Sequence, residues 1–250
     1  MTERDPWSAL DGEVAQWATP PALWLRDDDA TGPAPAVATL LDTCAAADVP
    51  ACLAVIPALL DPEFAPLLAA HAAETTVIPH GFGHTNYAPE GEKKSEFGDH
   101  RSLEVMSHEL RGGLERTQTA FGTRFRPIFV PPWNRCGAMT GGALKGAGYT
   151  ALSAKSTPAG VTGVTVIDVH IDIIDWRRTR GYGGDLPILE TLRARLTALR
   201  NEGKEHEPTG ILTHHAVHDD DAWTFLETLF GRLEGKVNWL TVDDVLRAMR

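Results

Sequence analysis

Short apolar runs of β-strand type alternate along this chain with stretches whose apolar residues recur three and four positions apart. The first pattern predicts strands, and the second predicts helices with one buried face. Strands are expected at residues 23–26, 51–56, 75–79, 127–130, 149–153, 164–169, 210–213 and 238–240. Helices are expected at residues 36–47, 63–74, 107–121, 186–200, 222–233 and 243–249. Alternation of strands and helices implies a parallel sheet.

The number of these units favours a barrel. Roughly seven or eight strand–helix units in one chain of this size are more typical of a closed or nearly closed barrel than of an open sheet. We therefore expect an α/β fold, a distorted or incomplete (β/α)7-8 barrel, formed by residues 1–250 as a single domain. The stretch 86–101 contains Pro, Gly and many charges, and it is expected to be a long surface loop.

Composition and charge narrow the classes of function. With 43% hydrophobic and 23% charged residues, the chain can bury a sizeable core, which excludes a disordered tail, a collagen-like repeat and a coiled coil. The formal net charge of -11 argues against a general nucleic-acid binder and against docking on an anionic membrane surface, because both need clustered Lys and Arg. The sequence leaves the oligomeric state undefined.

The N-terminal segment and the cysteines bear on the compartment. No secretory signal is recognised, and no uninterrupted apolar run approaches the ~20 residues that cross a bilayer, so a cytoplasmic location is expected. The three cysteines, Cys44, Cys52 and Cys136, are odd in number and lack CxxC spacing. Neither a disulfide framework nor a cysteine zinc site is therefore expected.

The polar residues that stand out are placed at the ends of expected strands. They are Asp27-Asp28-Asp29, His80 with His84, Pro131-Pro132-Trp133-Asn134, Asp172 with Asp175, and His214-His215. In parallel α/β barrels the carboxyl ends of all strands open onto one face, where catalytic groups gather. We therefore expect these distant residues to meet in one pocket.

His80 and His84 are candidate metal ligands. Imidazoles four positions apart can bind one ion, and the glycines at 81 and 83 indicate a curled loop rather than a helix. One carboxylate of the aspartate run would complete a set of two histidines and one carboxylate. The repulsion among three adjacent aspartates needs a cation or an arginine, which Arg26 supplies in part. The alternatives are surface histidines in a loop and a solvated acidic turn.

His214 is a candidate acid. Strand alternation would aim one of His214 and His215 inward and the other outward. An imidazole that titrates near neutrality suits proton transfer to a leaving group. Asp172 or Asp175 could orient it, and Trp176 could shield it from water. The structural alternative is a histidine bonded to a backbone carbonyl.

Taken together, these motifs resemble the polysaccharide deacetylases of the NodB-homology group, carbohydrate esterase family 4. Five motifs occur in the order of that family, between residues 22 and 216: Leu25 to Asp29, His80 to His84, Val130 to Asn134, Asp172 to Trp176, and Leu212 to His214. The resemblance implies the barrel of the NodB and glycoside hydrolase–deacetylase type. It also implies a polysaccharide-deacetylase-like catalytic domain that hydrolyses an N-acyl group, N-acetyl first of all, on a carbohydrate or related amide.

The resemblance also implies roles for individual residues. Asp28 becomes the catalytic base, His214 the acid, and Asp29, His80 and His84 the metal ligands. The other register of the aspartates, Asp27 with Asp28, stays open. Supporting or substrate-binding roles are implied for Asp27, Arg126, Pro132, Trp133, Asn134, Asp172, Asp175 and Trp176. Among these, Asn134 or Arg126 would tether the base, and Asp172 or Asp175 would partner the acid. The expected metal is divalent, with zinc first and cobalt, nickel or iron also compatible.

The chain also departs from the pattern of that family. The usual Thr-Phe-Asp-Asp-Gly is altered, and Arg-x-Pro-x-Gly becomes Pro-Pro-Trp-Asn, which affects the expected substrate more than the chemistry. Two further functions stay open. One is a non-haem metal oxygenase, because two histidines and a carboxylate also hold iron in such enzymes. The other is a non-catalytic carbohydrate-binding module on the same fold.

Overall fold

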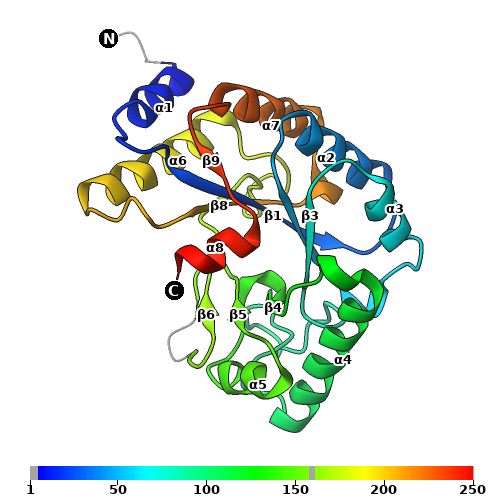
Figure 1. Cartoon of the computed structure of the whole chain (residues 1–250). Coiled ribbons are helices and arrows are strands. Elements are labelled where there is room, and N and C mark those ends of the chain that lie inside the picture. The colour runs from blue at the N-terminus through cyan, green and yellow to red at the C-terminus, as the bar shows by residue number, and fades with distance from the viewer. Residues whose placement is uncertain (1–4, 158–160, 250) are drawn as a thin grey trace.

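The computed structural model describes residues 5–157 and 161–249. The strands are β1 (Ala22–Ala30), β2 (Ala51–Val55), β3 (Thr75–Pro79), β4 (Ile128–Phe129), β5 (Ala151–Leu152), β6 (Thr165–Val166), β7 (Ile171–Asp172), β8 (Thr209–Thr213) and β9 (Asn238–Trp239). The helices are α1 (Pro6–Val14), α2 (Pro35–Ala46), α3 (Phe64–Ala70), α4 (Leu103–Phe121), α5 (Thr140–Ala147), α6 (Asp185–Asn201), α7 (Asp220–Leu233) and α8 (Val242–Ala248). Figure 1 shows their arrangement.

The strands form two parallel sheets. One has the order β3-β2-β1-β8-β7 with β9 added to β1, and the other has the order β4-β5-β6. Single bridges between Val77 and Phe125 and between His80 and Val130 join β3 to the segment of β4. On the other side, the Val169 amide donates to β5's neighbour Ala154, and the next amide donates to Gly210 of β8. The expected α/β fold, a distorted or incomplete barrel of the NodB type with parallel strands, is confirmed.

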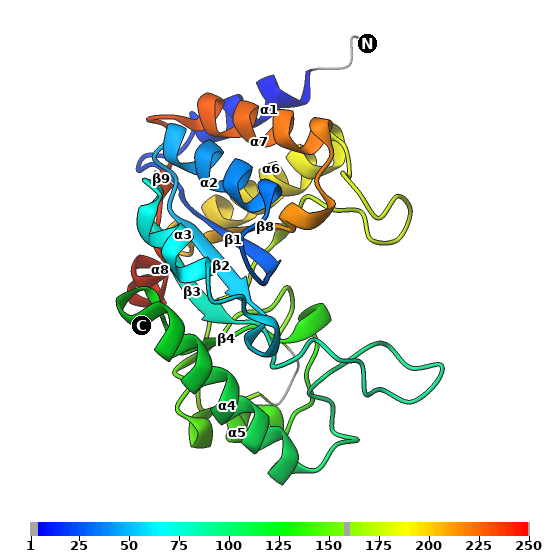
Figure 2. The same ribbon diagram turned by 90° about the vertical axis from the view of Figure 1, so that its right-hand side faces the viewer.

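Helices cover the sheets from outside. In Figure 2, α2, α6 and α7 lie along one side of the strands β1 and β8, and α4 and α5 lie beside β4. The larger sheet shares one apolar core with these helices, including Leu40, Leu192 and Phe225. The smaller sheet has its own core with α4 and α5, including Leu110 and Leu144. A third apolar cluster joins residues of both sheets, including Trp24, Ile78 and Ile128. In the described part of the chain, no helix has the length and apolar character that spanning a membrane requires.

Two helices differ from the sequence expectation. The helix α5 was not predicted, because glycines at 141, 142 and 146 lower its helix propensity. Its buried residues Ala143, Leu144 and Ala147 pack in the core beside α4, so tertiary contacts override the weak propensity. The helix α4 begins at Leu103, earlier than its apolar pattern indicates, because the Ser102 hydroxyl accepts a hydrogen bond from the amide of Val105 and caps it.

The expected strand at 164–169 is shortened to β6, and a strand that was not predicted, β7, follows it. Thr165 and Val166 pair with β5 as β6, whereas Ile171 and Asp172 pair with β8 as β7. This one segment therefore passes from the smaller sheet to the larger. His170 lies at the crossing, where its Nδ1 accepts a hydrogen bond from the amide of Gly210 at 3.0 Å.

We expect His170 to make the fold less stable in acid. Burial, with the nearby charge of Arg195, lowers the pKa of His170 to about 3. Below a pH of about 6.5, His170 is protonated in the unfolded chain but stays neutral in the folded chain. Stability is therefore lost as the pH falls from about 6.5 toward 3. The expected loss between pH 7 and pH 5 is about 2 kcal/mol. Urea unfolding at both pH values measures it, and His170→Gln should remove that share of the loss; an unchanged pH dependence would contradict the assignment.

Candidate metal centre and active site

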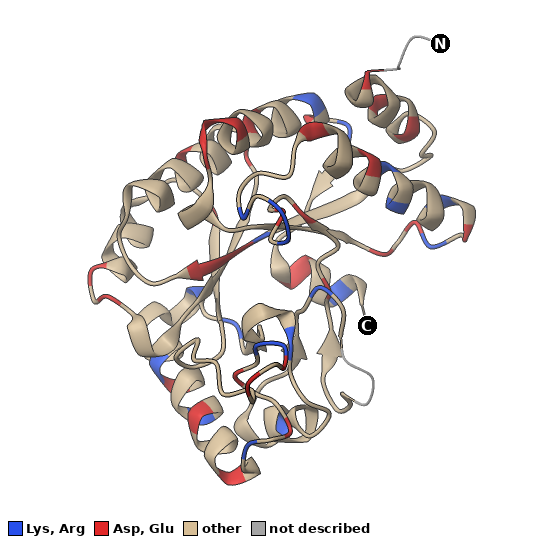
Figure 3. Ribbon diagram, turned by 180° about the vertical axis from the view of Figure 1, so that it is seen from behind, with Lys and Arg blue, Asp and Glu red and all other residues tan. Residues whose placement is uncertain are grey.

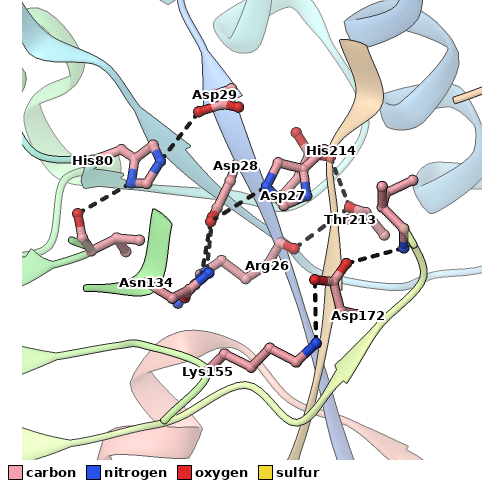
Figure 4. A network of polar contacts seen from close by, with 12 residues as sticks. Arg26, Asp27, Asp28, Asp29, His80, Asn134, Lys155, Asp172, Thr213 and His214 are labelled. Carbon is pink, nitrogen blue, oxygen red and sulfur yellow. Dashed lines mark hydrogen bonds and ion pairs between the residues drawn. The ribbon is translucent and has the colours of Figure 1, made fainter. Parts of the chain in front are cut away.

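A cavity opens where the carboxyl ends of β1, β3 and β8 meet. Its walls include Asp28 and Asp29 at the end of β1, His80 and His84 after β3, and His214 after β8. Figure 4 shows Asp28, Asp29, His80 and His214 directed toward a common space. The register of the parallel strands explains this meeting, because Asp27 lies beside Thr213, the last residue of β8, so that Asp28 and Asp29 are level with the residues that follow β8. Residues that are far apart in the sequence are thereby brought together.

Asp29, His80 and His84 form a cluster that fits a metal ion. Their candidate ligand atoms all lie within 4.8 Å of one another, and the Asp29 Oδ1 is 3.2 Å from the Nε2 of each histidine. The Nδ1 of His80 lies 3.1 Å from the carbonyl oxygen of Val130. Because a carbonyl only accepts, Nδ1 donates to it, and Nε2 is the ring nitrogen directed at Asp29.

One oxygen of Asp29 indicates whether these residues fit a metal ion. Its Oδ1 is buried and has no hydrogen-bond partner among the described residues. A buried carboxylate oxygen 3.2 Å from two imidazole nitrogens, with no hydrogen bond to either, is stabilised by a cation placed among the three groups. Two imidazoles and one carboxylate are also a donor set that divalent transition metals prefer. The residues present therefore fit a divalent cation.

The backbone around this cluster is strained. Asp29, His84, Trp133 and Asn134 have positive φ angles of 70°, 55°, 55° and 54°, in the left-handed region that non-glycine residues rarely adopt. They are four of the six such residues in the described chain, and all four line the cavity. Strain of this kind persists where the surroundings fix it, and it concentrates at functional sites. The Trp133 ring lies 4.4 Å from that of His84 and packs against it.

Charges within the cluster shift its ionisation. Burial alone would raise the pKa of Asp29, but the adjacent His80 and His84 outweigh it and hold that pKa well below its ordinary value. The pKa of His84 is lowered by burial and by the neighbouring His80. Asp29 is therefore a carboxylate and His84 is a neutral imidazole near neutral pH, which are the forms that bind a metal.

Arg26 holds Asp28 in place. Its Nε donates to Asp28 Oδ1 at 2.8 Å, and one terminal nitrogen donates to Oδ2 at 3.0 Å. Arg26 is fully buried, and its other donors reach Ser153 and the Asn134 Oδ1. A bidentate pair of this type fixes the position and orientation of the carboxylate. Asn134 thus acts on Asp28 through Arg26 rather than directly.

Arg126 does not tether the base, which corrects one sequence expectation. Both its Nε and a terminal nitrogen donate to Asp243 of α8 at 2.6 Å, and Arg126 is not among the cavity residues. The reason is register, because Arg126 lies at the entrance to β4, at the opposite end from the cavity-facing Pro131-to-Asn134 stretch. Arg26, two positions before Asp28 on β1, makes the contact with Asp28 that was expected of Arg126.

Asp27 faces away from the cavity. It is fully buried and accepts hydrogen bonds from the Thr213 hydroxyl at 2.7 Å and from the His215 amide at 2.9 Å, and it pairs with the His215 ring. Strand alternation explains why Asp27 and Asp28 point to opposite sides of β1. His214 and His215 divide in the same way: His214 lines the cavity and His215 turns to Asp27, although both are buried.

His214 lies next to Asp28 and Trp176. Its Nε2 is 4.0 Å from Asp28 Oδ2, and its ring stands edge-on to the Trp176 ring at 4.7 Å. The expected partnership with Asp172 or Asp175 is wrong. Asp172 accepts from the Ile174 amide and pairs with Lys155, and Asp175 accepts from the amides of Arg177 and Arg178. The His214 Nδ1 is buried without a partner among the described residues.

Glu96 is a site residue that the sequence did not indicate. It lies in the 86–101 loop with 1% exposure, and it accepts hydrogen bonds from the amides of Phe82, Gly83 and Thr85, within and just after the HxxxH segment. Gly81 allows this approach, because a Cβ there would lie 2.1 Å from a Glu96 oxygen and its φ of +61° favours glycine. The only available signal was an acidic residue in a charged loop, which does not distinguish it from its neighbours.

We expect Glu96→Gln to weaken metal binding. The amide group turns a donor toward backbone donors, so the loop that carries His84 loses part of its support. Supporting residues of this kind typically change metal affinity by about 10- to 100-fold. Calorimetric titration of the metal-free variant with Zn²⁺ measures the change. Glu92→Gln is the matched control, because Glu92 is exposed in the same loop; equal affinities of the two variants would contradict the role of Glu96.

Solved structures with this fold are carbohydrate-active hydrolases. PdaA of Bacillus subtilis, a family 4 carbohydrate esterase, aligns over 97% of this chain and 89% of its own, with 13% identity and a TM-score of 0.57. A family 4 carbohydrate esterase from Streptomyces lividans in complex with acetate aligns over 86% and 89%, with 15% identity and a TM-score of 0.56. A family 4 acetyl xylan esterase from Clostridium thermocellum in complex with a cobalt ion aligns over 90% of both chains, with 16% identity and a TM-score of 0.52.

The likeness is one of fold. No family model matches this chain in sequence, and no curated protein does either. The chain thus has the NodB-type fold of the family 4 carbohydrate esterases and polysaccharide deacetylases, with a widely diverged sequence. The structural neighbours are deacetylases and esterases, which are hydrolases. The resemblance found from the five motifs is confirmed at this level.

Proposed function

We propose that this protein is a metal-dependent hydrolase that removes an N-acyl group, N-acetyl first of all, from a carbohydrate or related amide. The observation that carries the proposal is the Asp29, His80 and His84 cluster beside Asp28 and His214 in one cavity of about 680 Å³. The fold of deacetylases and esterases supports it. So do the cobalt ion and the acetate that accompany two of the solved neighbours.

Asp29, His80 and His84 would hold the cation. A divalent metal supplies Lewis acidity, which polarises an acyl carbonyl and makes a water more acidic. The carbonyl of Val130 fixes the His80 ring through Nδ1, and Glu96 fixes the loop that leads to His84. Zinc is the first expectation for the metal, with cobalt, nickel and iron compatible with the same donors.

Asp28 is suited to accept the proton of the attacking water. Its bidentate pair with Arg26 holds the carboxylate in one orientation, and a carboxylate so placed can serve as a general base. The oxygen of the water forms the new bond to the acyl carbon. His214, 4.0 Å from Asp28, is placed to donate a proton to the nitrogen as the C–N bond breaks. The products are a carboxylic acid and an amine, so the proton given up by the water and the proton delivered to nitrogen are both accounted for.

Release of acid from N-acylated substrates tests the proposal. The protein is stripped with a chelator, reloaded with Zn²⁺ or Co²⁺, and assayed for acetate over a broad panel of N-acetylated sugars and amides. We expect acetate from the reloaded protein and none from the stripped protein. Absence of acid from the whole panel would contradict the proposal. Sugar binding without turnover, unchanged in His80→Ala, would instead support a non-catalytic carbohydrate-binding module.

A further inference from the structure

The cavity carries positive charge at its mouth, although the chain is acidic. Of the 14 residues that line the cavity, five are Lys or Arg, whereas 23 of 250 are in the whole chain, which has a net charge of -11. The five come from four segments of the chain: Lys94, Arg135, Lys155, and Arg177 with Arg180. Figure 3 shows basic segments on loops near the acidic end of β1. Such a concentration of one sign in a cleft focuses the electric field on a ligand of the opposite sign.

Most of these cations are not neutralised. Lys155 pairs with Asp172 at 3.4 Å. Within residues 5–157 and 161–249, no carboxylate forms an ion pair with the other four cations that line the cavity. Of the acidic lining residues, Asp28 is already paired with Arg26, and Asp29 turns to the histidines. The positive charge at the mouth is therefore available to a ligand.

The segment 175–181 carries Arg177 and Arg180, and hydrogen bonds within the segment hold its backbone in place. The Asp175 side chain accepts from the Arg177 amide at 3.0 Å, and the Asp175 carbonyl accepts from the Arg180 amide at 2.8 Å. Arg180 has a φ of 55°, so this turn is held in a conformation that an arginine does not favour. The hydrogen bonds fix the backbone of this turn, and among the described residues no carboxylate pairs with the guanidinium groups of Arg177 and Arg180.

We propose that the substrate of this site is an anion, an N-acylated molecule that also carries a carboxylate or a phosphate. This inference rests on the proposed hydrolase function and specifies its substrate class. Lys94, Arg135, Arg177 and Arg180 bind the anionic group at the mouth, while the N-acyl group enters toward Asp28 and His214. Arginine suits this task because its guanidinium binds either anion through two parallel hydrogen bonds.

Binding to the metal-free protein tests the inference without hydrolysis and without a cation that could bind the anion directly. Three probes differ only at one position of the sugar: neutral N-acetylglucosamine, its 6-phosphate, and its 6-carboxylate, N-acetylglucosaminuronic acid. At low ionic strength we expect at least one anionic probe to bind roughly tenfold more tightly than the neutral sugar, and the advantage to shrink as salt screens the charges. The two anionic probes show which group the site prefers.

Charge variants locate the effect. Arg177→Gln with Arg180→Gln should lower the affinity for the preferred anion roughly tenfold and leave the affinity for the neutral sugar unchanged. Arg178→Gln is the matched control, because Arg178 belongs to the same turn, is 87% exposed and does not line this cavity. Equal affinities of the wild type for all three probes, or equal losses in the double variant and the control, would overturn the proposal.

Acetate release from the metal-loaded protein separates this inference from the hydrolase proposal. Arginine-dependent binding of an anionic probe without acetate from any substrate would leave the anion site standing and remove the hydrolase. Equal rates of acetate release from neutral and charged sugars, unchanged by the double variant, would leave the hydrolase standing and remove the anion preference.

Discussion

Replacing His80 by alanine is expected to abolish metal binding and acyl hydrolysis together. His80 is 2% exposed and contributes one of the three converging ligand atoms. With two ligands left, the cluster loses the arrangement that holds a divalent ion, and the Lewis acid is lost with it. We expect hydrolysis to fall on the order of 1000-fold or more. Elemental analysis of the purified variant and its rate of acetate release measure both effects.

His206→Ala is the matched control for this variant. His206 is exposed, between α6 and β8, and contributes nothing to the cavity. It should keep the metal content and rate of the wild type. A His80→Ala protein that retains stoichiometric metal and full activity would show that the chemistry lies elsewhere in the molecule.

Asp28→Asn is expected to separate metal binding from catalysis. Asparagine keeps the size of the side chain but cannot take a proton from water, so the rate should fall by about 10²–10⁴-fold while metal binding is retained. The buried guanidinium of Arg26 also loses its counter-charge, and breaking such a pair typically costs about 3–5 kcal/mol of stability. Zinc titration, acetate release and urea unfolding measure the three effects.

Asp27→Asn controls for the loss of a buried carboxylate on the same strand. Asp27 pairs with His215 on the side of β1 away from the cavity, so its replacement should lower stability but keep the rate within about tenfold of the wild type. If Asp27→Asn were the slower enzyme and Asp28→Asn the faster, the base would be Asp27 and the other register of the aspartates would apply.

The sequence predicted the fold class because most strands and most helices have a local signal, β7 being a strand that was not predicted. The apolar run at 75–79 coincides with β3, and the spacing of apolar residues at 222–233 indicates most of α7. Some strands are shorter than the apolar run that predicted them. β4 has only two residues within the run 127–130, because the length of a strand depends on how many residues of its neighbour pair with it. The helix α5 was not predicted because its glycines have low helix propensity, and packing in the core stabilises it nevertheless.

Within the candidate site, sequence indicated residues that follow a strand. Asp28, Asp29 and His214 stand at the ends of β1 and β8, where the topology decides their position. The roles of Arg26 and Arg126 depend instead on the direction of each side chain, which the spacing of residues in the sequence does not predict. The role of Asp175 could not be predicted from spacing either, because its carboxylate accepts hydrogen bonds from backbone amides that come together only in the folded loop. Glu96 reaches the site from a loop whose path has no periodic pattern.

Anomalous scattering from crystals grown with Zn²⁺ tests the central claim most directly. The account predicts one strong zinc peak that the Oδ1 of Asp29 and the Nε2 atoms of His80 and His84 surround, with Asp28 outside the ligand set and still paired to Arg26. Zinc bound only at other positions under saturating metal, with Asp29 hydrogen-bonded to the two histidines instead, would contradict it.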